Sequence, residues 1–205
     1  MNRILIATTN PGKIKEFKTL LKNLPAELLN PKDLGIDILV EEDGVDYVEN
    51  ARKKAGAYCQ ASGLMTIADD SGLEVDVLHG APGLHSARFS PLPGATDEDR
   101  RSYLLEKLKP YPQPWNARFF CSLALAFADE TQYTFQGICY GKIINQERGQ
   151  NGFGYDPIFE LSGCGQTMAE LSDADKNEVS HRGRAVKAAL PTIKRILKES
   201  AGQIS

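Results

Sequence analysis

Apolar positions in the first part of the chain change from the spacing of a strand to that of a helix. Residues 4–7 form a short apolar run typical of a buried strand, and residues 8–12, Thr-Thr-Asn-Pro-Gly, form a turn after it. The next segment, 13–21, places its apolar residues on one helical face, and these are Ile14, Phe17, Leu20 and Leu21. The sequence therefore predicts a strand, a loop and a helix in that order.

The same alternation continues through the next segment. Residues 46–60 have apolar positions near helical spacing, with Asp46 as the cap, and predict a second helix. Residues 64–68 predict a short apolar strand that ends at the turn 69–72, Asp-Asp-Ser-Gly, and residues 73–78 then alternate apolar with acidic residues. This interpretation places two carboxylates at the end of a strand.

The second half of the chain contains a helix, a strand pair and a final helix. Residues 97–108, capped by Thr96, predict a third helix. Residues 118–128 and 131–144 predict two strands that pair antiparallel across a short turn, and a last helix is predicted over 180–198. Alternating strands and helices followed by an antiparallel pair favour an α/β fold, with a mixed β-sheet flanked by helices.

Composition narrows the class of protein. Hydrophobic residues make up 41% of the 205 residues and charged residues 25%, which is typical of a soluble globular chain. The length fits a single α/β domain, or one domain divided into two lobes around a cleft. The formal net charge of -3 gives no sign of the basic domain that binds nucleic acid, so any phosphate binding must be local.

Cysteine usage and apolar run lengths indicate the compartment. The four cysteines are widely separated and form no CxxC pair, which argues against a zinc site and a disulfide framework and favours a reducing compartment. The longest uncharged apolar stretch, 119–128, has ten residues, whereas a membrane-spanning helix needs roughly twenty. The apolar run at the N-terminus is too short for a signal peptide. We expect a cytoplasmic protein with no membrane partner.

One candidate phosphate site follows the first predicted strand. Backbone N–H groups and the helix dipole at such a strand-to-helix turn favour an anion, and a lysine adds positive charge. The segment is Thr8-Thr9-Asn10-Pro11-Gly12-Lys13. It lacks the GxxxxGK[ST] spacing of a Walker A loop, and the alternative is a plain Asn-Pro-Gly turn.

Two acidic clusters are candidates for binding a metal ion. Glu41-Glu42-Asp43 is one, and Asp69-Asp70, at the end of an apolar strand, is the other. Desolvated carboxylates that face each other repel unless a cation intervenes, and oxygen ligands together with substrate phosphates are how Mg²⁺ is usually held. The alternative for Glu41-Glu42-Asp43 is a solvated acidic run.

Two further segments have candidate binding residues. Gly152-Phe153-Gly154-Tyr155-Asp156-Pro157 combines flexible glycines, aromatic rings and an acid, which suits a loop that closes over a planar base; the alternative is a bulged turn with core aromatics. Ser180-His181-Arg182 opens the last predicted helix, where Ser180 would cap it and the next two side chains would point into solvent or into a cleft. An ordinary capped helix would need no function.

Taken in order, several motifs closely resemble the inosine triphosphate pyrophosphatase family, from about residue 4 to residue 198. They are Thr8-Thr9-Asn10-x-x-Lys13, Glu41-Glu42, Glu49-Asn50-Ala51, Ala68-Asp69-Asp70-Ser71-Gly72-Leu73, Gly80-Ala81-Pro82-Gly83, Gly152-Phe153-Gly154-Tyr155-Asp156-Pro157-Ile158-Phe159, Ala169-Glu170-Leu171 and Ser180-His181-Arg182. The resemblance implies one fold over residues 1–205, with an elongated mixed sheet, two lobes around a central nucleotide cleft, and a homodimer.

The resemblance also implies an activity. Members of the family hydrolyse deaminated purine nucleoside triphosphates (ITP, dITP and XTP) to the monophosphate and pyrophosphate with Mg²⁺, which cleanses the nucleotide pool. Asp70 is implied as general base, Glu42 with Asp70 as metal ligands, and Asp69 as a supporting acid. The residues implied to hold phosphates and sugar are Thr8, Thr9, Asn10, Pro11, Gly12, Lys13, Lys54, Ser71 and Lys176. Those implied to frame and read the purine are Phe153, Gly154, Tyr155, Asp156, His181 and Arg182.

Two positions depart from the family's usual residues: Thr9 stands where a smaller Gly or Ser is frequent, and Arg100 where Asn is frequent. We expect the second change to be peripheral.

Two rival functions keep the same cleft: a regulatory module that binds a nucleotide without hydrolysis, and a phosphatase that removes the terminal phosphate. Donors from Arg182 or nearby backbone would accept a 6-oxo purine and disfavour adenine.

Overall fold

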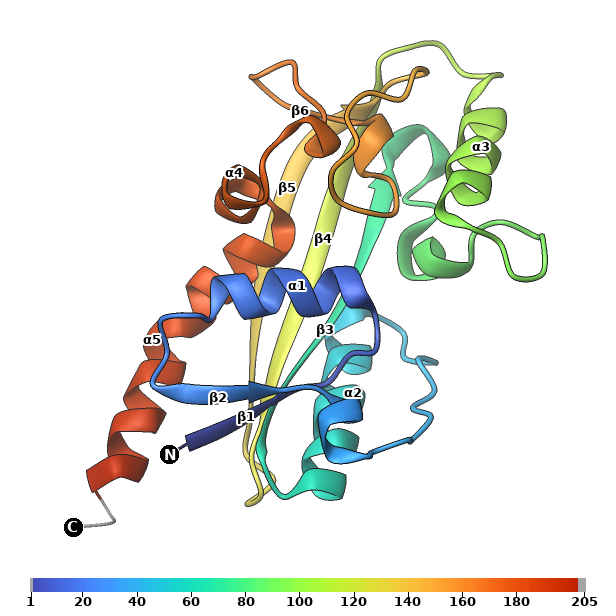
Figure 1. Ribbon diagram of the computed structural model, residues 1–205. Coiled ribbons are helices and arrows are strands. Elements are labelled where there is room, and N and C mark those ends of the chain that lie inside the picture. The colour runs from blue at the N-terminus through green and yellow to red at the C-terminus, as the bar shows by residue number, and fades with distance from the viewer. Residues whose placement is uncertain (1, 203–205) are drawn as a thin grey trace. The chain divides into compact units, whose positions relative to one another are not determined.

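The computed structural model describes residues 2–202, whose elements follow one another as Figure 1 shows. The chain divides into two compact units. Within the described residues, the first unit consists of residues 2–70, 121–137 and 182–202, and the second unit of residues 71–120 and 138–181. The chain first passes from the first to the second unit at the Asp70–Ser71 peptide bond.

Six strands form one mixed sheet within the described residues, in the order β2-β1-β3-β4-β5-β6. Strand β1 pairs in parallel with β2 and β3, and β5 pairs antiparallel with β6. Neighbouring strands β4 and β5 are joined by the short turn 127–131, which only an antiparallel pair allows. The predicted mixed sheet and hairpin are confirmed. The strands are β1 (Asn2–Ile6), β2 (Ala26–Leu29), β3 (Met65–Val75), β4 (Trp115–Ala126), β5 (Gln132–Ile143) and β6 (Phe159–Leu161).

Helices α1 to α4 begin where the sequence supplies a side chain that caps their first N–H groups. Asn10 accepts from the Lys13 N–H at the start of α1, Asp46 accepts from the Glu49 N–H at the start of α2, and Thr96 caps α3. Helix α1 starts at Pro11 and so includes the end of the predicted turn, because proline fits the first helical turn. The helices are α1 (Pro11–Leu20), α2 (Tyr47–Ser62), α3 (Asp97–Leu108), α4 (Asp173–Val179) and α5 (His181–Gly202).

In the first unit the sheet is covered on both faces, because successive side chains of a strand point to opposite sides. One face packs against α1 and α5, and its core includes Ile4, Ile6, Phe17, Ile67, Leu123, Ala185 and Ile193. The other packs against α2, and its core includes Leu5, Ala7, Ala51, Ala55, Ala68 and Ala124. Ile67 and Ala68 of β3 therefore mark the two faces.

The second unit has a core of its own. Its buried residues come from the C-terminal part of β3, from α3, β4 and β5, and from the segment after the glycine-rich loop 149–154; they include Leu73, Val75, Leu104, Leu108, Trp115, Phe119, Cys139, Ile158, Phe159 and Met168. The rings of Phe119 and Phe159 lie 4.6 Å apart. This core supports the segment that the sequence assigns to base binding.

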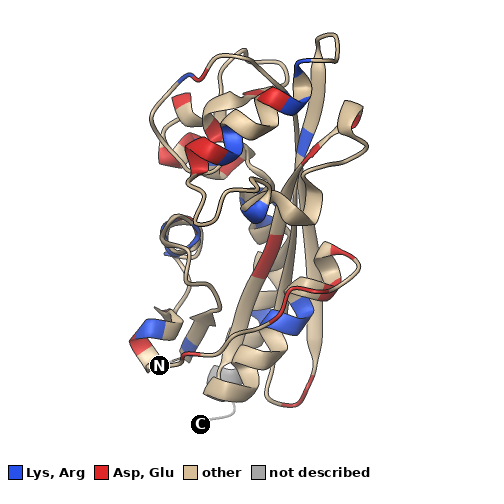
Figure 2. Ribbon diagram, turned by 90° about the vertical axis from the view of Figure 1, so that its right-hand side faces the viewer, with Lys and Arg blue, Asp and Glu red and all other residues tan. Residues whose placement is uncertain are grey.

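One prediction about the sheet was wrong. The strand predicted over 64–68 does not end at Asp69; β3 continues as one strand to Val75, so the two acids lie within it. Figure 2 shows this acidic stretch inside a long strand. The strand continues because each acid has buried partners on its own face, as described below, and local sequence does not reveal them. Elements β2, β6 and α4 were not predicted.

Among the residues that the structure describes, none of the helices combines the length and the apolar character needed to span a bilayer.

Candidate active site

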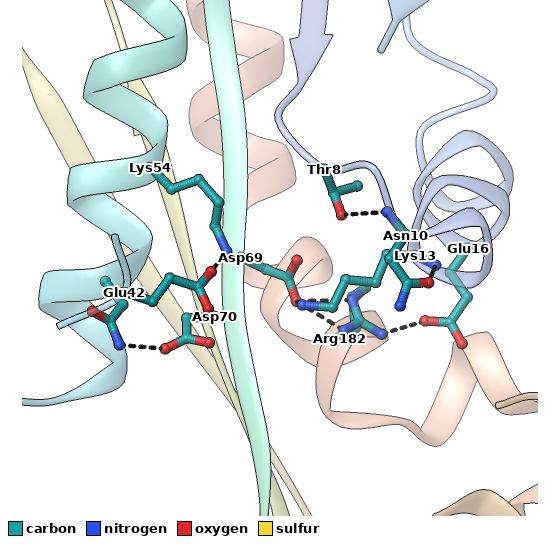
Figure 3. A network of polar contacts seen from close by, with 10 residues as sticks. Thr8, Asn10, Lys13, Glu16, Glu42, Lys54, Asp69, Asp70 and Arg182 are labelled. Atoms are coloured by element: carbon teal, nitrogen blue, oxygen red, sulfur yellow. Dashed lines mark hydrogen bonds and ion pairs between the residues drawn. The ribbon is translucent and has the colours of Figure 1, made fainter. Parts of the chain in front are cut away.

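Two neighbouring acids of β3 form the centre of the candidate site. Asp69 and Asp70 are 1% and 6% exposed, and Figure 3 shows their side chains on opposite sides of the strand. Asp69 shares the face of Ile67, toward α1 and α5, and Asp70 shares that of Ala68, toward α2. The two acids are adjacent in the sequence, but their carboxylates have different contacts on the two faces of the strand.

Asp69 is bound by two cations. Its Oδ2 atom accepts from Nε and Nη2 of Arg182, at 3.1 and 2.8 Å, and lies 3.0 Å from the Lys13 ammonium. Burial alone would raise the pKa of Asp69, but Arg182, Lys13 and Lys54 together hold it far below its usual value. Asp69 is therefore ionised and acts as a fixed negative charge that orients Lys13.

Arg182 is in turn held by a second acid. Its Nη1 atom donates to Oε2 of Glu16 at 2.5 Å, and its side chain is 1% exposed. Glu16 is on α1, one turn after Lys13, so one helical face supplies both a cation and an acid to this network. Two acids and two cations balance within the cluster, as a buried group of charges requires.

Asp70 has a different environment. Its Oδ2 atom accepts from the Nδ2 amide of Asn50 on α2 at 2.9 Å. Burial raises the pKa of Asp70 and the nearby Glu42 carboxylate adds to the rise, which outweighs the lowering by Asn50, Lys54 and Lys13. A carboxylate with a raised pKa is suited to accept a proton from water.

Glu42 and Lys54 meet beside Asp70. Glu42 belongs to a segment without regular secondary structure before α2, and its carboxylate forms an ion pair with the Lys54 ammonium of α2. Burial lowers the pKa of Lys54, but Asp69, Glu42 and Asp70 raise it more, so Lys54 is charged. Because these charges shift the pKa values of both Lys54 and Asp70, they form one charged cluster in the first unit.

The oxygen donors of this cluster fit a Mg²⁺ ion that is held partly by the protein and partly by a phosphate ligand. In the described part of the chain no group of three or more His, Cys, Asp or Glu side chains could hold a metal by itself. Mg²⁺ typically takes one or two carboxylates and completes its shell with water and substrate phosphates. Glu42 and Asp70 are two oxygen donors whose mutual repulsion a cation would relieve, so a metal shared with a phosphate ligand fits them.

The loop at the start of α1 lies next to Lys13 in the chain. Asn10 accepts from the Lys13 N–H at 3.1 Å, and the Asn10 N–H donates to Oγ1 of Thr8 at 3.2 Å. Thr9, Asn10 and Pro11 are exposed. The positive end of the α1 dipole and the Lys13 ammonium therefore favour an anion at this loop.

In the second unit, Asp156 organises the segment predicted to contact the base. Its buried Oδ2 atom accepts from the Phe153 N–H at 2.8 Å and from the Lys176 ammonium at 2.5 Å. That ammonium lies 4.7 Å from the centre of the Phe153 ring. The Tyr155 hydroxyl donates to the Ser86 carbonyl at 2.9 Å. Ser71, the first residue of this unit, is half-buried on β3.

Of the two orientations expected for His181 and Arg182, into solvent or into a cleft, the structure excludes solvent. His181 is 6% exposed and stacks on the Phe119 ring at 4.7 Å, and Arg182 is engaged by the two acids. Buried partners distant in sequence cause the difference. Sequence reasoning also gave no role to Asn50 or Glu16, although Lys13 and Glu16 share a helical face that could have suggested a pair.

Together the fold and the site define an α/β protein with a mixed sheet that carries a buried acid pair, each acid beside a lysine. The Ham1 family model matches residues 4–192. A dITP/XTP pyrophosphatase of Prochlorococcus marinus (strain NATL1A) is 44% identical over 194 residues, 95% of either chain, and that of Geobacter sulfurreducens is 46% identical over 91% of this chain and 94% of its own. The chain belongs to the Ham1 family.

Solved structures agree with this assignment. A HAM1 protein from Coxiella burnetii superposes with a TM-score of 0.84 at 35% identity and covers 97% of this chain and 100% of its own. The Staphylococcus aureus Ham1 protein superposes with a TM-score of 0.81 at 36% identity over the same shares. The predicted α/β class and family resemblance are thereby confirmed.

Proposed function

We propose that the protein is a magnesium-dependent pyrophosphatase that hydrolyses dITP, XTP and ITP to the nucleoside monophosphate and pyrophosphate. Family membership and the dITP/XTP pyrophosphatase activity for which its relatives are named support this proposal. The observation that carries it is the buried Asp70 carboxylate, whose pKa is raised and which lies within the electrostatic influence of Glu42, Lys54 and Lys13. This arrangement supplies a base, oxygen donors and cations, and needs no protein nucleophile.

Glu42, Asp70, Lys13 and Lys54 each have a role in this reaction. Bound Mg²⁺, held by Glu42 and Asp70, would neutralise charge on the triphosphate and polarise its phosphorus. Asp70 takes a proton from the water that attacks the α-phosphorus, and Asn50 orients its carboxylate. The bond from the α-phosphorus to the bridging oxygen then breaks, and pyrophosphate leaves. Lys13 and Lys54, with the predicted Lys176, stabilise the charge on that leaving group.

We assign base recognition to Phe153, Gly154, Tyr155, Asp156, His181 and Arg182, and phosphate and sugar binding to the loop 8–13 and Ser71. The aromatic ring of Phe153 and the backbone of its loop suit a planar purine. A 6-oxo group accepts a hydrogen bond, whereas the 6-amino group of adenine leaves a donor facing a donor. A base contact by Arg182 would come from a guanidinium that Asp69 and Glu16 already hold through three of its five N–H donors.

One assay separates this proposal from its rivals. The protein is incubated with Mg²⁺ and dITP, XTP, ITP or ATP, and both pyrophosphate and orthophosphate are quantified. Pyrophosphate from the 6-oxo nucleotides, with little from ATP, is the expected result. Orthophosphate alone would identify a terminal phosphatase, and nucleotide binding without either product would identify a regulatory module.

We also propose a single catalytic domain over residues 1–205 that works as a cytoplasmic homodimer and protects the nucleotide pool. The family resemblance supports this assembly. Sedimentation equilibrium at micromolar protein tests it, because a monomer at every concentration contradicts the dimer.

A further inference from the structure

Helix α3 contacts the glycine-rich loop of the second unit at Gly154, through both backbone polar groups of that residue. The Gly154 N–H donates to Oδ2 of Asp97 at 2.7 Å. Its carbonyl accepts from Nη1 of Arg101 at 2.9 Å. Asp97 and Arg101 are four residues apart, so they lie on one side of α3 and can both form hydrogen bonds with Gly154.

Asp97 and Arg101 are each held in place by a further ion pair. Nε and Nη2 of Arg101 donate to the two carboxylate oxygens of Glu147, at 2.7 and 3.0 Å, and this fork leaves Nη1 aimed at Gly154. The Arg100 guanidinium pairs with Asp97 and donates to the Ala95 carbonyl at 2.6 Å. Arg100, expected to be peripheral, therefore supports the contact to the loop.

Asp97 stays ionised in this arrangement. Partial burial raises its pKa, but the hydrogen bond from the Gly154 N–H and the charge of Arg100 lower it more. A backbone N–H bound to an ionised carboxylate is held more strongly than one bound to a neutral acceptor.

The neighbours of Gly154 are fixed from other directions. The Phe153 N–H is bound to Asp156, and the Tyr155 hydroxyl is bound to the Ser86 carbonyl. Gly154 itself has a φ of 61°, in the left-handed region that glycine adopts readily, and without a Cβ its backbone has more conformational freedom to lose than that of any other residue. Three consecutive residues are thus each anchored, and α3 supplies the anchor of the middle one.

We propose that Asp97 and Arg101 are positioning residues that hold Gly154 so that Phe153 and Tyr155 are ordered before a purine base binds. The inference rests on the proposed function, because it deepens the role of the same loop. Preordering a loop lowers the entropy that binding must overcome. Removing the hydrogen bonds of Asp97 and Arg101 to Gly154 should therefore weaken binding of the base and leave binding of phosphate unchanged.

Arg101→Met is the decisive variant, because methionine keeps the apolar stem and removes all donors. The KM for dITP is expected to rise about tenfold with kcat within about twofold of the wild type. Inorganic pyrophosphate, which lacks a base, should inhibit both proteins with the same Ki. Arg101→Lys, which keeps one donor for the Gly154 carbonyl, should recover part of the loss.

Arg195→Met is the matched control, since Arg195 pairs on the surface of α5 with Glu199. It should leave the KM, the kcat and the Ki unchanged. Exchange of the Gly154 amide hydrogen, followed by NMR without nucleotide, should be faster in Arg101→Met and Asp97→Ala than in the control, and this readout does not require turnover.

The outcomes separate the two claims. A wild-type protein that releases no pyrophosphate from dITP or XTP overturns the proposed function and this inference with it. An active wild type with an unchanged KM in Arg101→Met, or with a pyrophosphate Ki that rises as much as the KM, overturns the inference alone.

Discussion

The carboxylates of Asp69 and Asp70 point to opposite faces of β3, although the two residues are adjacent in the chain. Asp69 meets Arg182 and Lys13, and its pKa falls far below the usual value against the effect of burial. Asp70 meets Asn50, and burial raises its pKa. Two carboxylates with pKa values moved apart are suited to different tasks, so we assign the fixed charge to Asp69 and the proton transfer to Asp70.

Asp70→Asn should abolish most turnover and leave nucleotide binding measurable. The amide keeps an acceptor for the Asn50 donor but cannot take the proton of water, and such a base contributes about 10²- to 10⁴-fold to the rate. Initial rates with dITP and titration with a non-hydrolysable analogue measure the two effects. Asp129→Asn, in the exposed turn after β4, is the control and should retain full activity. An active Asp70→Asn enzyme would refute the assignment.

The same variant should be more stable than the wild type in the absence of metal and nucleotide. A carboxyl group whose folded pKa is raised stabilises the fold below its unfolded pKa of about 3.9 and loses that contribution as pH rises through the folded pKa. At pH 7.5 the ionised Asp70 therefore costs stability, and Asp70→Asn should gain about 1 kcal/mol in urea unfolding. The gap between the two proteins should close toward pH 4. A gap that widens on acidification contradicts the raised pKa.

Sequence alone predicted the elements whose signals are local. The predicted helix over 97–108 agrees with α3 at both ends, and its start is determined by a capping box of Thr96 and Asp99 within four residues. Prediction from the sequence failed where a side chain depends on a partner that is distant in the sequence. Asp69 looked like the end of a strand, and its partner Arg182 stands 113 positions away, so nothing near Asp69 indicated that its charge could be compensated inside a sheet.

The candidate site was predictable in its residue types and less so in its contacts. The acids of β3, Glu42 and the lysines stand out as motifs, and the structure brings Lys13, Lys54, Glu42 and the two acids into one charged cluster. The roles of the supporting partners do not stand out. Asn50 belongs to one of the motifs that carry the resemblance and Glu16 to none, and only the packing of α2 and α1 on the sheet gives them roles.

Arg182→Met should be strongly destabilising. It leaves Asp69 and Glu16 buried with one cation fewer, and breaking a buried ion pair from one side costs about 3–5 kcal/mol. The measurement is the free energy of unfolding in urea at pH 7.5. Arg195→Met removes an exposed pair and should cost less than about 1 kcal/mol. Equal losses in the two variants would show that the buried network contributes no more than a surface ion pair.

Lys54→Met should bind a divalent cation more tightly when no nucleotide is present. The Lys54 ammonium occupies the Glu42 carboxylate and adds positive charge near Asp70, so it competes with a metal for both acids. We expect about tenfold tighter Mn²⁺ binding by electron paramagnetic resonance titration, together with weaker pyrophosphate binding. Glu42→Gln should shift the Mn²⁺ affinity the other way. Weaker Mn²⁺ binding in Lys54→Met would contradict the competition and place the metal away from Glu42.

Gly152→Ala tests how closely the glycine-rich loop approaches the buried ion pair beneath it. A Cβ at Gly152 would lie 2.1 Å from Oδ2 of Asp156, closer than real Cβ atoms approach, and 3.1 Å from the Lys176 ammonium, which is a tight contact. Gly163 has a similar positive φ of 87° but open space around its Cβ position, so Gly163→Ala carries the backbone strain alone. Gly152→Ala should therefore lose about 1–3 kcal/mol more in urea unfolding than Gly163→Ala, because the added methyl must push apart a packed pair. Matching losses would mean that the loop can lift from Asp156 at little cost.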